Sequence, residues 1–404
     1  MTQRIELVEH APATGHPLPA AIGQALAATS IVTASPDPYT PGRWLLRAGS
    51  KVGAFSISTS DGAGEPVTVR IMPKVPIARL FFLLGYSINP GGSWREEHVE
   101  VGEQDGVLPA LAYAVERQIG LALRPGLLQG YRPVAESAML VRGRIREADQ
   151  IRKRFGAVLP VEITHDEFTT DVAENRILRG AVERLLRLTE VPSDVRRRLL
   201  HHRARLAKVT PPVPGQPIPA WQPSRLNIRY QPALHLARAV LEGMSPEHTT
   251  GELRINGFLF DMNRLFEDFV TVSLRESLRG TGLTGVLQDS QHLDEAGLIR
   301  MKPDFVLYGP AGVPVAVADA KYKAEKRAGY PDSDLYQMLA YCTALGLSEG
   351  HLVYAKGNGP HTAHQVRHTG VVLHQHALEL DQAPTGLLTD IAALADRMGT
   401  GPTA

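Results

Sequence analysis

Three side chains between residues 304 and 321 are of the types that hydrolyse phosphodiesters with the help of a metal ion. Asp304 opens an apolar, β-rich run, and Asp319 and Lys321 end a second one. The segment between the two runs reads Gly-Pro-Ala-Gly over residues 309–312, which predicts a hairpin turn. Because strand side chains alternate between faces, Asp319 and Lys321 should point to the same side. The hairpin would therefore gather two carboxylates and one ammonium group around one point.

These groups suit metal-dependent hydrolysis. Magnesium prefers oxygen ligands, and it usually takes one or two carboxylates while keeping water and a substrate phosphate. Asp304 and Asp319 would supply the carboxylates, and the main-chain carbonyl of Ala320 is a third candidate ligand. Lys321 would hold the attacking water as hydroxide or stabilise the developing negative charge. A lone Asp-x-Lys is common, so the neighbouring elements must support this interpretation.

Two predicted helices flank the hairpin in the chain. The apolar periodicity predicts a helix over Phe258–Leu278, in which Glu267 adjoins the buried stripe. A second helix is predicted from Leu335 to about Leu345. Gln337 and Tyr341 lie four residues apart on it and so share a face, from which they would steer Lys321, a phosphate or the metal-bound water. Alternatively, Glu267 is a solvent-facing residue, and Gln337 with Tyr341 is an ordinary half-buried pair.

The chain has 404 residues, which is too long for one ordinary core. We expect a mixed α/β fold with two domains, residues 1–165 and 166–404. A hydrophobic content of 43% and a charged content of 21% indicate a folded protein. The sequence shows no signal peptide and no apolar run of membrane length, so we expect a soluble, cytoplasmic protein without a membrane partner. No phosphate-binding Walker loop is present, so the chain does not resemble a nucleotide-hydrolysing motor.

Basic residues gather in three places although the net charge is only +1. They lie at residues 142–146, at residues 152–154 and along a predicted helix over Asp194–Lys208. Each segment is either a contact for nucleic acid or an acidic partner, or an exposed surface rich in ion pairs. Asp171 and Glu174 form a pattern close to a capping box, which predicts a helix that runs to about Leu188.

Histidines are frequent near the C-terminus, at positions 361, 364, 368, 374 and 376. No neighbouring cysteine or clear carboxylate completes a metal site, so a structural or surface role is favoured for them. Cys342 is the one cysteine, which excludes an internal disulfide.

The residues of the hairpin and of the following helix carry a family resemblance. Pro303-Asp304 together with Asp319-Ala320-Lys321 resembles the PD-(D/E)XK nuclease motif, and Gln337-Met338-Leu339-Ala340-Tyr341 is similar to the Gln-x-x-x-Tyr element of its RecB-like branch. Most of the chain resembles the McrC family, the nuclease subunits of McrBC modification-dependent restriction systems. Five stretches carry that resemblance: residues 130–133, 140–145, 171–176, 258–267 and 319–323.

The resemblance implies a restriction-endonuclease-like core in the C-terminal half, preceded by a separate mixed α/β domain that docks onto a McrB-like AAA+ GTPase ring and stimulates its GTP hydrolysis. It implies magnesium-dependent (or manganese-dependent) cleavage of DNA, containing modified cytosine such as 5-methylcytosine, after translocation by that ring. Asp304, Asp319 and Glu267 would bind the metal, and Lys321 would be the catalytic lysine. Two alternatives stay open: an adaptor that mainly activates the GTPase, and a RecB-like nuclease that acts alone.

Overall fold

The computed structural model describes residues 3–59, 66–88, 90, 106–155, 157–213, 215–243, 249–250, 253–322, 332–355 and 361–400. The chain forms two compact units. Unit 1 combines residues 1–110 with residues 243–404, and unit 2 consists of residues 111–242. Neither border coincides with the predicted one at residue 165, which lies inside a strand, β9 (Val161–Thr169). None of the described helices is both long and apolar enough to cross a membrane.

The N-terminal part of unit 1 contains two sheets. A five-stranded sheet has the order β1-β6-β5-β11-β10, and a three-stranded sheet has the order β2-β4-β3. Their strands are β1 (Gln3–Val8), β2 (Thr14–Pro17), β3 (Val32–Pro36), β4 (Arg43–Ala48), β5 (Lys51–Thr59), β6 (Val67–Met72), β10 (Thr249–Thr250) and β11 (Leu253–Asp261). Helix α1 (Ala20–Ala28) and the apolar helix α2 (Ile77–Ile88) complete this part.

Strand β11 corrects one prediction. Residues 258–261 are strand, and the helix expected from Phe258 begins only at Met262 as α8 (Met262–Ser277). Antiparallel pairing with β5 over the whole length of β11 holds Phe258 and Phe260 in extended conformation. Asp261 then caps α8, because its side chain accepts a hydrogen bond from the Asn263 backbone N–H at 3.0 Å. The pairing of β5 with β11 also explains why the two ends of the chain share one unit.

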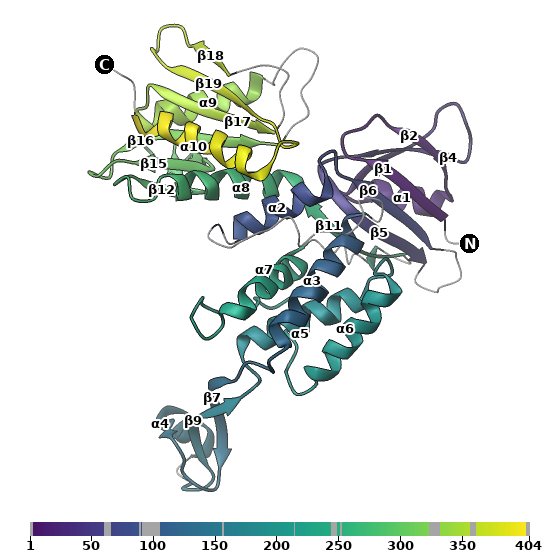
Figure 1. Ribbon diagram of the computed structural model, residues 1–404, viewed down its shortest axis with the longest axis vertical. Helices are drawn as coiled ribbons and strands as arrows, with labels where there is room; N and C mark the ends of the chain where they lie inside the picture. Colours follow the sequence, from purple (N-terminus) through teal and green to yellow (C-terminus); the bar gives the residue numbers. More distant parts are fainter. Residues whose placement is uncertain are drawn as a thin grey trace. The chain divides into compact units, whose positions relative to one another are not determined.

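The C-terminal part of unit 1 is a six-stranded mixed sheet in the order β12-β15-β16-β17-β19-β18. Helix α9 packs on one face of this sheet, and helices α8 and α10 lie on the other (Figure 1). The strands are β12 (Thr284–Leu287), β15 (Phe305–Tyr308), β16 (Pro314–Lys321), β17 (Glu349–Ala355), β18 (Thr362–Gln365) and β19 (Val372–Leu378), and the two further helices are α9 (Asp332–Leu345) and α10 (Pro384–Thr400). A short ribbon of β13 (Gln291–His292) and β14 (Arg300–Met301) precedes β15.

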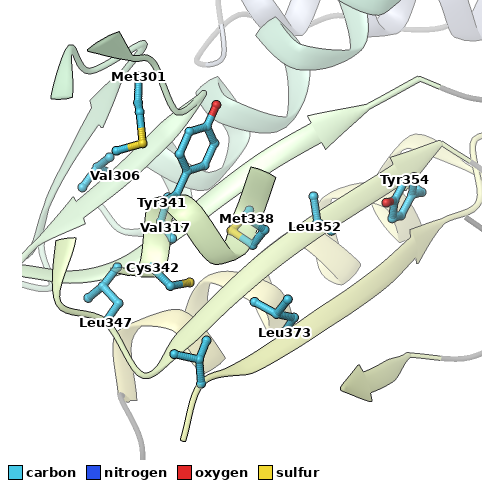
Figure 2. Packing of buried hydrophobic residues seen from close by; sticks show 11 residues of the cluster. Met301, Val306, Val317, Met338, Tyr341, Cys342, Leu347, Leu352, Tyr354 and Leu373 are labelled. Atoms are coloured by element: carbon cyan, nitrogen blue, oxygen red, sulfur yellow. The ribbon is translucent and has the colours of Figure 1, made fainter. Parts of the chain in front are cut away.

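Apolar side chains of α9 pack onto the central strands of this sheet. Met338, Tyr341 and Cys342 of α9 share one buried cluster with Val317 and Leu352, and the Tyr341 ring points toward Met301 (Figure 2). Val317 faces α9, and strand alternation places Asp319 and Lys321 on the same face. The core therefore carries the predicted site residues on the side of the sheet that α9 covers.

Gly350 allows this close packing of α9 on β17. A Cβ atom at position 350 would lie 2.5 Å from the Cys342 sulfur and 2.7 Å from Met338. We expect Gly350→Ala to lower the free energy of unfolding by about 1–3 kcal/mol, because overpacking displaces neighbouring side chains. Urea unfolding should show this loss, whereas Gly49→Ala, where the added Cβ meets no atom within 4 Å, should change little. Equal midpoints for the two variants would contradict the prediction.

Unit 2 consists of a helical bundle and a β-ribbon. The helices are α3 (Val107–Leu123), which begins in unit 1, α5 (Ala173–Arg187), α6 (Ser193–Arg205), η2 (Ile228–Tyr230) and α7 (Gln231–Glu242). The ribbon contains β7 (Gly130–Ala138), β8 (Arg144–Ile145), α4 (Glu147–Arg154) and β9, in the strand order β7-β9-β8 (Figure 1). Helices α5 and α6 confirm the elements expected from Asp171 and Asp194.

Asp171 has another role than the predicted cap. The N-cap of α5 is Val172, and no side-chain capping bond forms there. Asp171 instead accepts hydrogen bonds from Arg132 at 2.7 Å, from Arg176 at 2.7–2.8 Å and from the backbone and hydroxyl of Thr210 at 2.8 and 3.0 Å. Burial opposes ionisation, yet these hydrogen bonds hold the pKa of Asp171 well below its usual range. This carboxylate joins β7, the start of α5 and the segment after α6.

The basic residues of α6 are mostly committed to contacts within unit 2. Arg196 donates to the carbonyls of Leu186 and Leu188, and Arg198 pairs with Glu116 at 2.8 Å. Arg205 donates to the Leu123 carbonyl. These contacts favour the structural interpretation of the predicted basic helix over a phosphate-binding one.

The ribbon gathers its own cations around one buried carboxylate. Glu162 is 1% exposed and accepts from Ser137 at 2.5 Å, from Arg154 at 2.9 Å and from Arg146 at 3.0 Å. The Ser137 bond, together with Arg154 and Lys153, lowers the pKa of Glu162 to about 2. Much of this basic segment is therefore engaged in ion pairs within the ribbon, which favours the second of the two interpretations, an exposed surface rich in ion pairs.

The lowered pKa of Glu162 predicts that the stability of the ribbon depends on pH. The pKa of Glu162 is lower in the fold than its ordinary value of 4.5. The stabilisation that the ionised carboxylate gives the fold is therefore fully present above pH 4.5 and is lost as the pH falls toward about 2. We expect the protection factors of the amide protons in β7 and β9, which compare their exchange with the intrinsic rate at the same pH, to fall over that range in the parent protein. Glu162→Gln should exchange faster at pH 6 and lose this extra dependence, whereas exposed Glu167→Gln should behave as the parent does. An unchanged pH dependence in Glu162→Gln would rule out this role.

Candidate active site on the β15–β16 hairpin

The hairpin predicted around Gly309–Gly312 forms as expected. Strands β15 and β16 pair antiparallel with Phe305 opposite Ala318 and Val306 opposite Val317. The turn closes through a 2.9 Å hydrogen bond from the Gly309 N–H to the Val313 carbonyl. Asp304 immediately precedes β15, and Asp319 and Lys321 lie at the end of β16. The register thus brings Asp304 beside Asp319.

Asp304 is nearly buried, with 7% of its surface exposed. Its carboxylate accepts a 3.0 Å hydrogen bond from the Ala320 backbone N–H and a 2.9 Å bond from the Gln288 amide. Burial, followed by the negative charge of Asp319, raises the pKa of Asp304 to about 7. Two carboxylates therefore lie close together where water solvates them poorly.

Lys321 forms an ion pair with only one of these carboxylates, and so neutralises only that negative charge directly. Its ammonium forms an ion pair with Asp319 Oδ2, and Asp319 is 2% exposed. Burial opposes the charged form, but the Asp319 carboxylate outweighs burial and raises the pKa of Lys321 above its usual value. Lys321 is thus a cation at neutral pH, which suits the stabilisation of developing negative charge better than proton abstraction.

Glu267 of α8 lies within electrostatic reach of this group. Burial raises the pKa of Glu267, the Lys321 ammonium counteracts this shift, and the charge of Asp319 adds to it. The structure therefore brings Glu267 near Asp319 and Lys321, and the side chain is only half-buried.

Helix α9 contributes the predicted Gln337 and Tyr341. The Gln337 amide donates a 2.7 Å hydrogen bond to the Tyr341 hydroxyl, as expected of residues four apart on a helix. Burial, with the nearby Asp319 charge adding to it, raises the pKa of Tyr341 to about 12. The phenol therefore stays neutral beside the site, and Gln337 orients it.

Two further residues at the site were not predicted. Gln288 follows β12 with a positive φ of 51°, and its side chain and its backbone N–H both donate to Asp304, at 2.9 Å each. Asp334 of α9 is 3% exposed, interacts with the charge of Lys321 and accepts from the Tyr354 hydroxyl at 3.2 Å. Nothing in the sequence distinguishes Gln288 from other strand-end residues. Asp334 occupies the first turn of a helix, where acidic residues are common for other reasons.

The chemistry of the donor set fits a divalent cation. The described residues contain no group of three or more His, Cys, Asp or Glu side chains arranged to hold a metal ion, so Glu267 does not complete such a cluster. Magnesium, however, usually takes only one or two carboxylates from a protein. In the buried pair of Asp304 and Asp319, burial and then the charge of Asp319 raise the pKa of Asp304 to about 7, and a bound cation would stabilise such a pair.

The C-terminal histidines lie on or next to strands β17, β19 and β18 of the same sheet. His351 and His376 approach to 3.1 Å between ring nitrogens, and His361 and His374 approach to 3.0 Å. Burial lowers the pKa of His351 to about 3 and that of His376 to about 2, so both are neutral in the fold. Among the described residues, these histidines are not part of any group of three or more side chains arranged to hold a metal ion.

The chain is similar to known components of restriction systems. A family model described as "McrBC 5-methylcytosine restriction system component" matches residues 46–355. The chain is 21% identical over 315 residues to the type IV methyl-directed restriction enzyme EcoKMcrBC of Escherichia coli (strain K12), covering 73% of this chain and 89% of that protein.

Among solved structures, the chain is similar to one described as a refined half-complex from a tetradecameric assembly of Thermococcus gammatolerans McrB AAA+ hexamers with bound McrC. The TM-score is 0.58 at 17% identity, with 98% of this chain and all of that chain covered. This likeness confirms the predicted mixed α/β fold class. The family model spans more than half of the chain, and the chain therefore belongs to the McrBC restriction system component family.

Proposed function

We propose that this protein is the magnesium-dependent DNA endonuclease subunit of a modification-dependent restriction system. The observation that carries the proposal is the geometry of one hairpin, which holds Asp304, Asp319 and Lys321 together on the face that α9 covers. Membership of the McrBC family supports the same assignment.

Each residue of the candidate site would have its own role in cleavage. Asp304 and Asp319 would hold the metal, with the Ala320 carbonyl as a further candidate oxygen, and Glu267 would add negative charge close to them. Magnesium, when bound, lowers the pKa of its water and offsets charge on the phosphate oxygens. Lys321 carries a positive charge beside Asp319 and would stabilise the charge that develops on the phosphorus oxygens. Gln337 and Tyr341 would orient Lys321 or the scissile phosphate through their mutual hydrogen bond.

We also propose that a McrB-like AAA+ GTPase ring is the partner. The similar Thermococcus gammatolerans McrC is bound to McrB AAA+ hexamers. This chain has no Walker loop of its own, so translocation along DNA would require a separate motor. The part of the chain that precedes the C-terminal sheet of unit 1 would dock onto that ring and stimulate GTP hydrolysis; the border predicted at residue 165 lies inside β9.

One experiment tests the proposal and its alternatives. Plasmid DNA with and without 5-methylcytosine is incubated with the protein and magnesium, and GTP and a McrB-like GTPase are added in turn. We expect double-strand cleavage only of methylated DNA with magnesium, GTP and the partner all present, and no cleavage with EDTA.

The other outcomes favour the alternatives. Cleavage without GTP or partner would favour a RecB-like nuclease that acts alone. Stimulated GTP hydrolysis without cleavage in any metal would favour an adaptor, and it would overturn the proposed nuclease function.

A further inference from the structure

A buried carboxylate of the N-terminal sheet contacts the end of the strand that carries Lys321. Glu9 follows β1 and is 0% exposed. Its Oε1 atom accepts a 2.6 Å hydrogen bond from the Tyr322 hydroxyl and another, also of 2.6 Å, from the Lys74 backbone N–H. Residues 313 positions apart in the chain are thereby joined within unit 1.

Glu9 is a costly residue at this place. Burial raises its pKa, and its Oε2 atom is buried without a hydrogen-bond partner among the described residues. A buried polar atom without a partner lowers stability, and an apolar side chain would fill the same space without that penalty. A carboxylate does, however, fix the position of its partner, because the hydrogen bond forms only when the Tyr322 hydroxyl lies at one place.

Tyr322 is well placed to transmit this constraint to Lys321. It is the next residue in the chain, and strand alternation turns it to the face opposite to Lys321. Its ring lies 6.0 Å from that of Phe266 on α8 and 6.5 Å from that of His10, measured between centroids. The β16–β17 ladder ends at Lys321, so Tyr322 lies just beyond the last pair of that ladder. The hydroxyl bond to Glu9 therefore anchors the strand directly behind Lys321.

We infer that Glu9 is a positioning residue for Lys321, acting through the Tyr322 hydroxyl. The bond keeps the end of β16 extended and holds the Lys321 ammonium against Asp319. The N-terminal sheet thus helps to assemble the candidate active site and is more than a neighbouring module. The activity part of this inference rests on the proposed nuclease function, whereas the positioning part does not.

The test measures the position of Lys321 in the full-length protein without relying on cleavage. Lysines are acetylated with limiting acetic anhydride, and the rate at Lys321 is measured by mass spectrometry relative to exposed Lys302. We expect Tyr322→Phe and Glu9→Ala to raise that ratio about tenfold, the factor that corresponds to one lost hydrogen bond. Glu9→Gln, which keeps an oxygen acceptor for Tyr322, should stay within about twofold of the parent protein.

A matched control separates positioning from general loosening. Tyr113 donates to Asp194 at 3.0 Å in unit 2, so Tyr113→Phe removes the same kind of bond elsewhere. It should leave the Lys321 ratio unchanged. In cleavage assays with magnesium, GTP and partner, Tyr322→Phe should lower kcat about tenfold with KM unchanged.

The outcomes distinguish the two proposals. An unchanged Lys321 ratio in both Glu9→Ala and Tyr322→Phe, with a lower urea midpoint, would overturn the inference and leave Glu9 a purely structural residue. If the parent protein cuts no DNA, the nuclease proposal fails, but the acetylation ratios still decide whether Glu9 positions Lys321.

Discussion

Lys321→Ala is expected to lower the rate of DNA cleavage by about 100-fold to 1000-fold, the usual loss when one charge-stabilising group is removed from an active site. Lys321 is the cation paired with Asp319, and burial does not prevent its ionisation. Its loss would also leave Asp304 and Asp319 without that nearby positive charge. The variant should therefore fail to stabilise the charge that develops on the phosphate.

The measurement is single-turnover cleavage of methylated plasmid with saturating magnesium, GTP and partner. Stimulation of the partner's GTP hydrolysis and the circular dichroism spectrum should match those of the parent protein. Lys302→Ala removes an exposed lysine just before the same hairpin and should cut at the parent rate. Cleavage by Lys321→Ala as fast as by Lys302→Ala would exclude a catalytic role for Lys321.

Asp171→Ala is expected to lower the free energy of unfolding of unit 2 by about 1.5–3 kcal/mol, the range for hydrogen bonds to a charged group. Arg132 and Arg176 would keep their positive charges close together without the carboxylate that joins them. The Thr210 backbone N–H would lose its acceptor as well. Three segments of unit 2 would loosen together.

Urea unfolding together with amide hydrogen exchange would locate this effect. We expect faster exchange in β7, in the first turn of α5 and around Thr210. Asp166→Ala removes an exposed aspartate of β9 and should shift the unfolding midpoint little. A loss below about 1 kcal/mol in Asp171→Ala, within the range of ordinary point substitutions, would show that the network contributes little.

The Asp171 network also gives a physical meaning to two stretches of the family resemblance. Residues 130–133, 171–174 and 176 line one cavity of about 430 Å³ at the base of the ribbon. Arg132 comes from the first stretch, and Asp171 and Arg176 come from the second. These stretches thus build the junction between ribbon and bundle, whereas residues 319–322 belong to the candidate site. Lys323, the last residue of that stretch of the resemblance, lies outside the described residues.

Several local features of this protein can be predicted from the order of its residues alone. The β15–β16 hairpin, the shared face of Asp319 and Lys321, and the pair of Gln337 and Tyr341 follow from a turn and from the periods of strand and helix. Such features depend on residues close together in the chain, so pattern alone predicts them. The assignment of Asp304, Asp319 and Lys321 to catalysis remains a proposal.

The segments that share a core although they lie far apart in the chain become visible in the folded protein. Strand β11 pairs with β5, so Phe258 lies in a strand and not in the expected helix. The borders of the two units also differ from the predicted border at residue 165. The fold also brings Gln288 to Asp304 and Glu9 to Tyr322. These contacts join residues between 16 and 313 positions apart, and no local pattern encodes them, because burial and hydrogen bonding across the fold select the partner.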